Sequence, residues 1–362
     1  MFLTGAKTNS VIVGLIALFV VSACGGGGGG GGRGCGGSSN SEWLIPEDLV
    51  VDGGPGLDGI PAIDNPTFLS PDSLNTVAPD DPVIVLRYNG VVKIYPHDIM
   101  HWHEIVNDGD SSDPFSISYC PLTGTAMAWV GNPVHGDPTY GTSGNLYNSN
   151  LILFDRQTVS FFSQMLQVGV NGTRIREVAT QIPLVETIYS TALAMYPGAM
   201  VMTRATGFTR NYDLYPYSDY LTSARLLFPV SWKDNRLFEK DRVAGIYSGA
   251  SSKVYQLSCF GSTTQAINDQ FFNQSIIVVG NTDLDFAAIY DRQLSDGTIL
   301  SFTPIQGDLP NVLSDGEGNV WDVFGTAVSG PRTGEQLAIP RTYKAMWFAW
   351  VAFYPGAQIH FN

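Results

Sequence analysis

The chain has 362 residues, of which 14% are charged and 12% aromatic, and its formal net charge is −14. Few charges and many aromatic residues indicate a large folded core rather than a disordered chain. An acidic chain without a lysine and arginine cluster is a poor partner for nucleic acid and for anionic lipid surfaces, which argues against both.

The first 23 residues are predicted to be a lipoprotein signal peptide. Lys7 precedes an apolar run over 11–21, which is too short for a comfortable membrane span. Ser22-Ala23-Cys24 then resembles a bacterial lipobox, in which Cys24 is lipidated; the alternative is an ordinary secretory signal cleaved nearby. The residue after this cysteine is Gly25 and not Asp. By resemblance to the sorting rules of Gram-negative lipoproteins, this favours the outer membrane. We therefore expect a bacterial envelope lipoprotein that faces the periplasm or the cell surface and is held by its lipid.

Residues 24–41 form a predicted tether, because unbroken glycine over 25–32 cannot bury apolar surface. An N-terminal extension is expected over 42–80. The folded body then contains two of the four cysteines, Cys120 and Cys259.

The folded body is predicted to be an internal duplication. At an offset near 160, Lys93-Ile94-Tyr95 matches Lys253-Val254-Tyr255, and Tyr196-Pro197-Gly198-Ala199 matches Tyr354-Pro355-Gly356-Ala357. So long a period predicts two lobes rather than a solenoid. We place the first lobe at 81–202, a tyrosine-rich connector at 203–245 and the second lobe at 246–362.

Each copy is expected to be mainly β, with few short helices and two pseudo-symmetric β-rich lobes in all. Strands are predicted at 82–88 and 91–95 around the hairpin turn Asn89-Gly90, and again at 115–119, 126–130 and 151–154. Helices are predicted at 187–196 and 342–354, each ending before a proline. In the second helix, an aromatic stripe at i, i+3, i+4 and i+7 is expected to be core. The connector, with tyrosines at 212, 215, 217 and 220, is expected to form an ordered excursion over the first lobe.

One short region of the first copy concentrates reactive side chains. Cys120 lies in Tyr-Cys-Pro-Leu-Thr-Gly-Thr-Ala, soon after Trp-His-Glu-Ile-Val-Asn-Asp at 102–108, and four of the five histidines (97, 101, 103 and 135) flank it. In the alignment of the two copies, Gly280 stands opposite Cys120 and Thr263 opposite His103. Cys120 and His103 occur in the first copy only, so they are candidates for function rather than for the common fold. Cys259 aligns with Ile99 and is expected to be an isolated buried thiol.

These motifs, with Gly-Asn-Leu-Tyr-Asn-Ser at 144–149 and Phe-Asp-Arg-Gln-Thr at 154–158, resemble the bacterial "domain of unknown function 3179" family over roughly 80–360. The resemblance implies no established activity. Many family members carry Cys-Pro-Leu-Cys here, some with selenocysteine in the last position, which suggests thiol redox chemistry. Thr123 occupies that last position in this chain, so only a one-cysteine mechanism remains, through a mixed disulfide or a sulfenic acid.

The leading hypothesis is a single-cysteine thiol oxidoreductase. Cys120 is the nucleophile, His103 or His101 lowers its pKa or moves its proton, and the Thr123 hydroxyl donates to the sulfur. Glu104 is counted among the catalytic residues of the same site. This hypothesis expects the sulfur within about 4 Å of an imidazole nitrogen, as hydrogen bonding requires.

A metal-linked site is a second hypothesis. His101, His103 and Cys120 could bind copper or zinc, with His97 or His135 added. His101 and His103 share a face on a strand but not on a helix, so the idea depends on local structure.

The alternative from another class is a non-catalytic binding module that holds a glycan or an envelope protein in the cleft between the lobes. Asp155, Arg156, Ser163 and Gln164 are its candidate contacts, although an acid beside an arginine at a strand end is more often a structural ion pair. No phosphate loop or dinucleotide fingerprint is present, so no nucleotide cofactor is expected. The remaining interpretation is a scaffold whose cysteine and histidines belong to the core.

Overall fold

The computed structural model describes residues 42–131 and 139–360. The predicted signal peptide, the predicted lipidation site Cys24, the predicted tether and His135 lie outside the described residues. Ser41–Asn362 form one compact unit. Across the described ranges, no helix combines the length and the apolar character that crossing a membrane requires.

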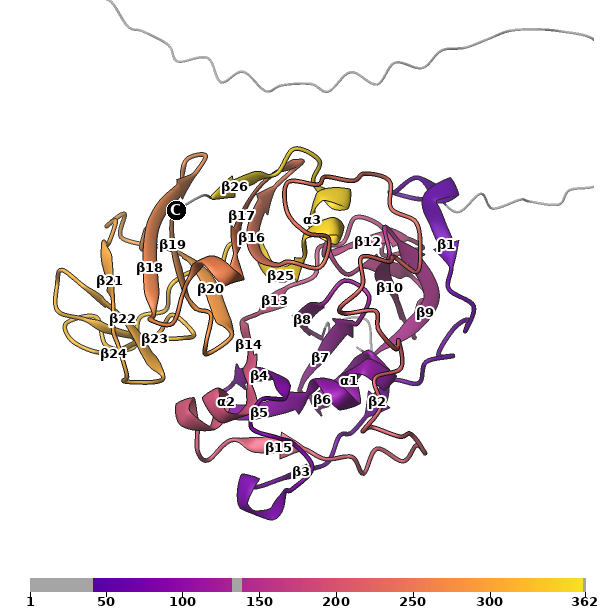
Figure 1. Ribbon diagram of the computed structural model, residues 1–362, viewed down its shortest axis with the longest axis horizontal. Helices are drawn as coiled ribbons and strands as arrows, with labels where there is room; N and C mark the ends of the chain where they lie inside the picture. Colours follow the sequence, from indigo (N-terminus) through magenta and orange to yellow (C-terminus); the bar gives the residue numbers. More distant parts are fainter. Residues whose placement is uncertain (1–41, 132–138, 361–362) are drawn as a thin grey trace, which may run out of the picture. The chain divides into compact units, whose positions relative to one another are not determined.

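Six small sheets make up the described chain (Figure 1). The first three, which we name blades 1 to 3, come from its first half. Blade 1 contains β1 (Val50–Asp52), β9 (Tyr140–Tyr147), β10 (Asn150–Asp155), β11 (Phe161–Ser163) and β12 (Val168–Asn171). Blade 2 contains β13 (Gln181–Ile182), β8 (Thr125–Val130), β7 (Asp113–Cys120), β6 (Ile105–Asp110) and β2 (Ile63–Asp64). Blade 3 contains β14 (Leu184–Ile188), β4 (Pro82–Tyr88), β5 (Val91–Pro96), β15 (Met200–Met202) and β3 (Phe68–Leu69).

The other three sheets come from the second half. Blade 4 contains β21 (Phe302–Pro304), β22 (Asn311–Asp315), β23 (Val320–Asp322) and β24 (Ala327–Ser329). Blade 5 contains β18 (Gln265–Phe271), β19 (Gln274–Asn281) and β20 (Phe286–Asp291). Blade 6 contains β25 (Thr342–Met346), β16 (Arg242–Ser248), β17 (Ser251–Gln256) and β26 (Gln358–His360).

The blades follow one another in a ring. Strand β6 contacts β9, β8 contacts β14, β18 contacts β21 and β16 contacts β20. Arg87 of blade 3 forms an ion pair with Asp322 of blade 4, and Tyr247 of blade 6 donates to the Leu166 carbonyl of blade 1 at 3.4 Å. The prediction of a mainly β chain is therefore confirmed, and its arrangement is a six-bladed β-propeller rather than two separate lobes.

Blades 3 and 6, which are opposite in this ring, share the order of four strands. In blade 3 the order β14-β4-β5-β15 ends in a parallel pair that aligns Lys93 with Met200. In blade 6 the order β25-β16-β17-β26 ends in a parallel pair that aligns Lys253 with Gln358. Lys93 bonds Asp108 at 2.8 Å in the first half, and Lys253 bonds Asp269 at 2.5 Å in the second.

The α-helices are short: α1 (His97–His103), α2 (Tyr189–Met195) and α3 (Trp347–Phe353). Short 3-10 turns cover Glu47–Leu49, Pro71–Ser73 and Leu257–Cys259. The predicted helices at 187–196 and 342–354 began too early, because Thr187 and Ile188 pair with β4, and residues 342–346 pair with β16. The aromatic stripe of α3 is core as predicted, with Trp347, Trp350 and Val351 all fully buried.

The predicted strands and their hairpin are confirmed. Strands β4 and β5 pair from Val83↔Pro96 to Tyr88↔Val91. Asn89 and Gly90 both have positive φ, 49° and 78°, as a tight two-residue hairpin turn requires.

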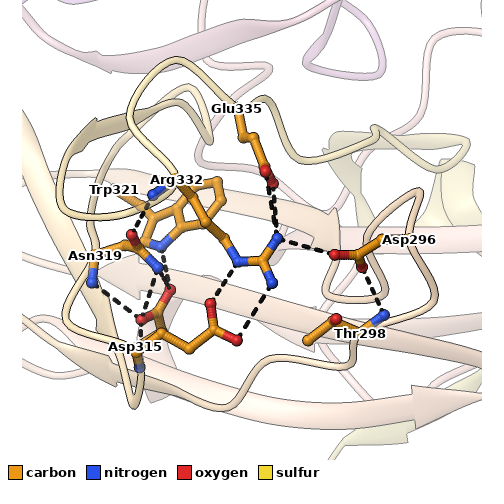
Figure 2. Close-up of polar contacts among 8 residues, drawn as sticks. Asp296, Thr298, Asp315, Asn319, Trp321, Arg332 and Glu335 are labelled. Atoms are coloured by element: carbon orange, nitrogen blue, oxygen red, sulfur yellow. Dashed lines mark hydrogen bonds and ion pairs between the residues drawn. The ribbon is translucent and has the colours of Figure 1, made fainter.

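A polar cluster fixes the loops of blade 4. Figure 2 shows the Arg332 guanidinium between Asp296, at 3.2 Å, and Glu335, at 3.3 Å. Beside it, Asp315 accepts hydrogen bonds from the Trp321 indole and from Asn319, both at 2.8 Å. Asp315 also accepts the Glu317 N–H at 2.9 Å and the Asn319 N–H at 3.1 Å, so a side chain holds the backbone of this turn.

Candidate functional site

Cys120 ends strand β7, and its side chain is almost completely buried. The chain turns back at once, because the Gly124 N–H donates to the Cys120 carbonyl at 2.8 Å. Gly124 takes a φ of +60°, which side chains rarely adopt. This turn joins β7 to β8 and folds Thr123 back against the cysteine.

The sulfur lies among hydrogen-bond donors. The Thr123 hydroxyl, the Leu151 N–H and the Thr123 N–H all interact with it and favour the thiolate. The Thr123 oxygen accepts bonds from Asn150 and Thr125, both at 3.0 Å, so its own proton is left for the sulfur. In the thiol form, Cys120 instead contacts the Ser149 carbonyl at 3.8 Å.

Burial outweighs these donors in the resting protein. It raises the pKa of the Cys120 thiol to about 11, and the charge of nearby Glu104 adds to the effect. The thiol is therefore protonated at neutral pH, and the donors act only when the proton has been removed.

Glu104 supplies a proton acceptor beside the thiol. It caps α1 with a φ of 58°, a left-handed conformation that costs energy for a residue with a side chain. Its N–H donates to Met100 at 2.9 Å, and its carbonyl accepts from Tyr119 at 2.7 Å, which holds it in place. Burial raises the pKa of its carboxyl to about 7, although a hydrogen bond from Tyr217 at 3.2 Å opposes this.

Tyrosines of the connector lie close to the sulfur. Burial, and then the charge that Cys120 acquires on ionisation, raises the pKa of Tyr215 and of Tyr220. Tyr220 donates to the Leu122 carbonyl at 2.9 Å, and Tyr217 to Glu104. These tyrosines of the connector contact the first half, whereas the carbonyl of the later connector residue Asp234 accepts the Trp347 indole of α3 at 2.8 Å. The tyrosines are site residues that the sequence motifs did not single out.

The histidines face other groups. His101 and His103 lie on helix α1, not on a strand, so they do not share the face that chelation needs. Both ring nitrogens of His103 are engaged, Nδ1 with the Pro61 carbonyl at 2.8 Å and Nε2 with the Tyr212 hydroxyl at 2.7 Å. His101 packs on Tyr215, and burial lowers its pKa to about 4.

The expected thiol–imidazole contact is not found where it was predicted. In the described ranges no hydrogen bond joins Cys120 to an imidazole, and His97 packs on Tyr119, with ring centroids 4.3 Å apart. The same ranges hold no group of three or more His, Cys, Asp or Glu side chains arranged to bind a metal ion. The predicted copper or zinc set of His101, His103 and Cys120 thus lacks its geometry, and a carboxyl replaces the imidazole beside the thiol.

The polar residues chosen for substrate binding serve the fold. Asp155 is fully buried and accepts the Gln157 and Thr158 N–H groups, both at 3.1 Å. Arg156 spans two carboxylates, Asp58 at 3.1 Å and Asp64 at 2.9 Å. Arg156 is thus a structural ion-pair residue, as one interpretation of the sequence held. Its partners are Asp58 and Asp64, which are far from it in the sequence, and not the adjacent Asp155.

Gln164 and Ser163 are also buried. Gln164 accepts from Asn150 at 2.8 Å and donates to Ser118 at 2.9 Å, which makes it the support behind the Thr123 hydroxyl rather than a surface contact. Ser163 bonds the Leu166 N–H at 3.4 Å.

Strands β7 and β19 have the same length and the same kind of pairing, and they end in different residues. Cys120 is the last residue of β7 and pairs with Thr125, and Asn281 is the last residue of β19 and pairs with Phe286. The structural counterpart is therefore Asn281 rather than Gly280. The other body cysteine, Cys259, is exposed and not buried as predicted, and it forms no disulfide with Cys120.

A family model described as "Protein of unknown function (DUF3179)" matches residues 57–357. No curated protein and no solved structure matches the chain.

Proposed function

We propose, for a chain that belongs to the DUF3179 family of proteins of unknown function, that Cys120 is the nucleophile of a single-cysteine thiol-redox reaction. One observation carries the proposal: the buried Cys120 thiol is near enough to the buried Glu104 carboxyl, whose pKa is about 7, for the charge of Glu104 to act on it, and Thr123 and Leu151 place hydrogen-bond donors at the sulfur. A base whose pKa lies near the working pH is suited to proton transfer.

The reaction that fits is exchange with a small disulfide. The Glu104 carboxylate takes the Cys120 proton, and the thiolate attacks one sulfur of the disulfide. A new bond from Cys120 to that sulfur forms as the old disulfide bond breaks, and the leaving thiolate receives the proton from Glu104. Thr123 and Leu151 stabilise the Cys120 thiolate before it attacks the disulfide.

The location is also a proposal. We infer that lipid on Cys24 and the glycine tether hold this body at the bacterial envelope, most simply at the outer membrane, since the sequence around Cys24 resembles a lipobox. Incorporation of a labelled fatty acid tests this. Label that is lost in Cys24→Ser supports the anchor, and label that persists in that variant contradicts it.

We further infer that the two halves of the propeller are copies of one ancestral unit. The matching order of blades 3 and 6, and the pairs Lys93–Asp108 and Lys253–Asp269, support this. Because Asn281 stands where Cys120 does, the reaction is assigned to the first copy, and the second copy completes the ring.

The test uses the full chain with Cys24, Cys35 and Cys259 each changed to Ala, so that Cys120 is the single thiol. Incubation of the folded protein with a small disulfide should give one mixed disulfide per chain, seen as a mass increase, and added thiol should reverse it. Cys120→Ser is the control and should give no adduct. A folded protein whose Cys120 forms no adduct would leave a binding module or a scaffold.

A further inference from the structure

A pocket opens beside the Cys120 site, between helix α1 and the connector. Its lining includes His101 and Trp102 from α1 and Arg210, Asn211, Pro216 and Tyr217 from the connector. The Trp102 indole donates to the Leu214 carbonyl at 3.1 Å, which fixes this wall against the connector. The pocket thus has flat aromatic walls built from two segments far apart in the sequence.

The pocket borders the reactive groups through one side chain. Tyr217 lines the pocket, and its hydroxyl donates to Glu104 at 3.2 Å. His101 also lines it and packs on Tyr215, with ring centroids 4.8 Å apart. A molecule in the pocket would therefore contact Tyr217, the side chain whose hydroxyl bonds Glu104.

Arg210 gives the pocket a positive charge in a protein of net charge −14. It is exposed, and its guanidinium donates to the Thr209 carbonyl at 2.9 Å. Among residues 42–131 and 139–360, no carboxylate pairs with it, whereas Arg204, on the same connector, pairs with Asp98 and Asp213, both at 2.7 Å. The Arg210 guanidinium is left available to an anion.

We propose that this pocket binds the substrate of Cys120, and that the substrate is a small disulfide that carries a carboxylate next to a flat apolar group. The carboxylate pairs with Arg210, and the apolar group packs on Trp102 and Tyr217. This inference rests on the proposed thiol chemistry, and it assigns Arg210 the role of a specificity residue. Movement of Tyr217 then admits the disulfide to the sulfur.

The experiment compares two aromatic disulfides, the anionic dithiobis(nitrobenzoate) and the neutral dithiodipyridine. Both react by the balanced exchange described above and release a coloured thiol, so each rate constant is read from absorbance. The single-thiol full chain is the parent, and Arg210→Gln is the variant. Arg176→Gln, at an exposed arginine that follows β12 and pairs with Glu42, is the matched control.

Loss of one charge contact near the surface should lower the anionic-to-neutral rate ratio about fivefold in Arg210→Gln, and added salt should shrink the difference. The ratio should not change in the control. As a second readout, nitrobenzoate alone should protect Cys120 from the neutral reagent in the parent but not in Arg210→Gln.

Each other outcome overturns a defined step. If both reagents react and the ratio is the same in parent and variant, Arg210 does not select the substrate, and the thiol chemistry stands. If neither reagent reacts with the folded protein, the proposed function fails, and the substrate assignment fails with it.

Discussion

The buried carboxyl of Glu104 makes a prediction about stability that needs no substrate. Its pKa is about 7 in the folded protein against 4.5 for an ordinary glutamate, mainly because it is buried. The folded state therefore holds a proton that the unfolded chain releases between these values. The contribution of Glu104 to the free energy of unfolding is therefore fully present below about pH 4.5 and is lost as the pH rises to about 7.

The size of this loss follows from the shift. A difference of about 2.5 pH units at about 1.4 kcal/mol per unit gives about 3 kcal/mol. The side chain is almost fully buried, so solvent screening does not reduce this figure much. Glu104→Gln cannot ionise and can still accept the bond from Tyr217, so it should be the more stable protein above about pH 7.

Urea unfolding of the wild type and of Glu104→Gln, from about pH 5 to about pH 8, measures the effect. The difference between the two proteins should grow with pH by about 3 kcal/mol. The histidines, which titrate near their ordinary pKa of 6.5 in the unfolded chain, contribute equally to both proteins and cancel in that difference. Glu47→Gln, at an exposed glutamate, is the control and should show no such trend. A difference that stays constant across this range would refute the reasoning.

Three further substitutions test the site and its surroundings. Gly124→Ala places a methyl group 2.6 Å from the Arg242 guanidinium at a φ of +60°. The free energy of unfolding, measured by thermal unfolding, should therefore fall by about 2 kcal/mol, and an unchanged melting temperature would contradict the tight turn. Thr123→Val removes a hydrogen bond to the thiolate and should slow the reaction of Cys120 with a neutral disulfide about tenfold at neutral pH; an unchanged rate would show that the hydroxyl does not serve the sulfur. Arg156→Gln breaks partly exposed ion pairs, so urea unfolding should show that the free energy of unfolding falls by less than about 1 kcal/mol. Cys120 should react at the same rate as in the parent, and a slower reaction would show that Arg156 belongs to the site.

Much of the local structure could be predicted from the sequence because its signals are local. The Asn89-Gly90 turn and the alternating runs beside it specified β4 and β5 almost to the residue. The boundaries of α2 and α3 were missed because the residues before them pair with strands more than 95 positions away. The ring of blades depends on many such distant pairings, and for this reason two lobes were expected.

The candidate site shows the same division. Cys120, Thr123 and Glu104 are close in the sequence and were selected together. The expected contact between His103 and the Cys120 sulfur is not formed, because His103 lies on a helix and its ring nitrogens bond Pro61 and Tyr212. Tyr217 lies 113 positions from its partner Glu104, and only the concentration of tyrosines in the connector could have drawn attention to it.

The most direct test of the central claim is the pH dependence of the Cys120 reaction rate with dithiodipyridine, in the single-thiol chain with and without Glu104→Gln. We predict an inflection near pH 7 in the parent, where Glu104 becomes the base. We predict its loss in the variant, with a rate about 100-fold lower at neutral pH, the usual contribution of a general base. Two superimposable profiles that follow only the ionisation of a thiol of pKa about 11 would show that Glu104 does not serve Cys120, and would contradict the account.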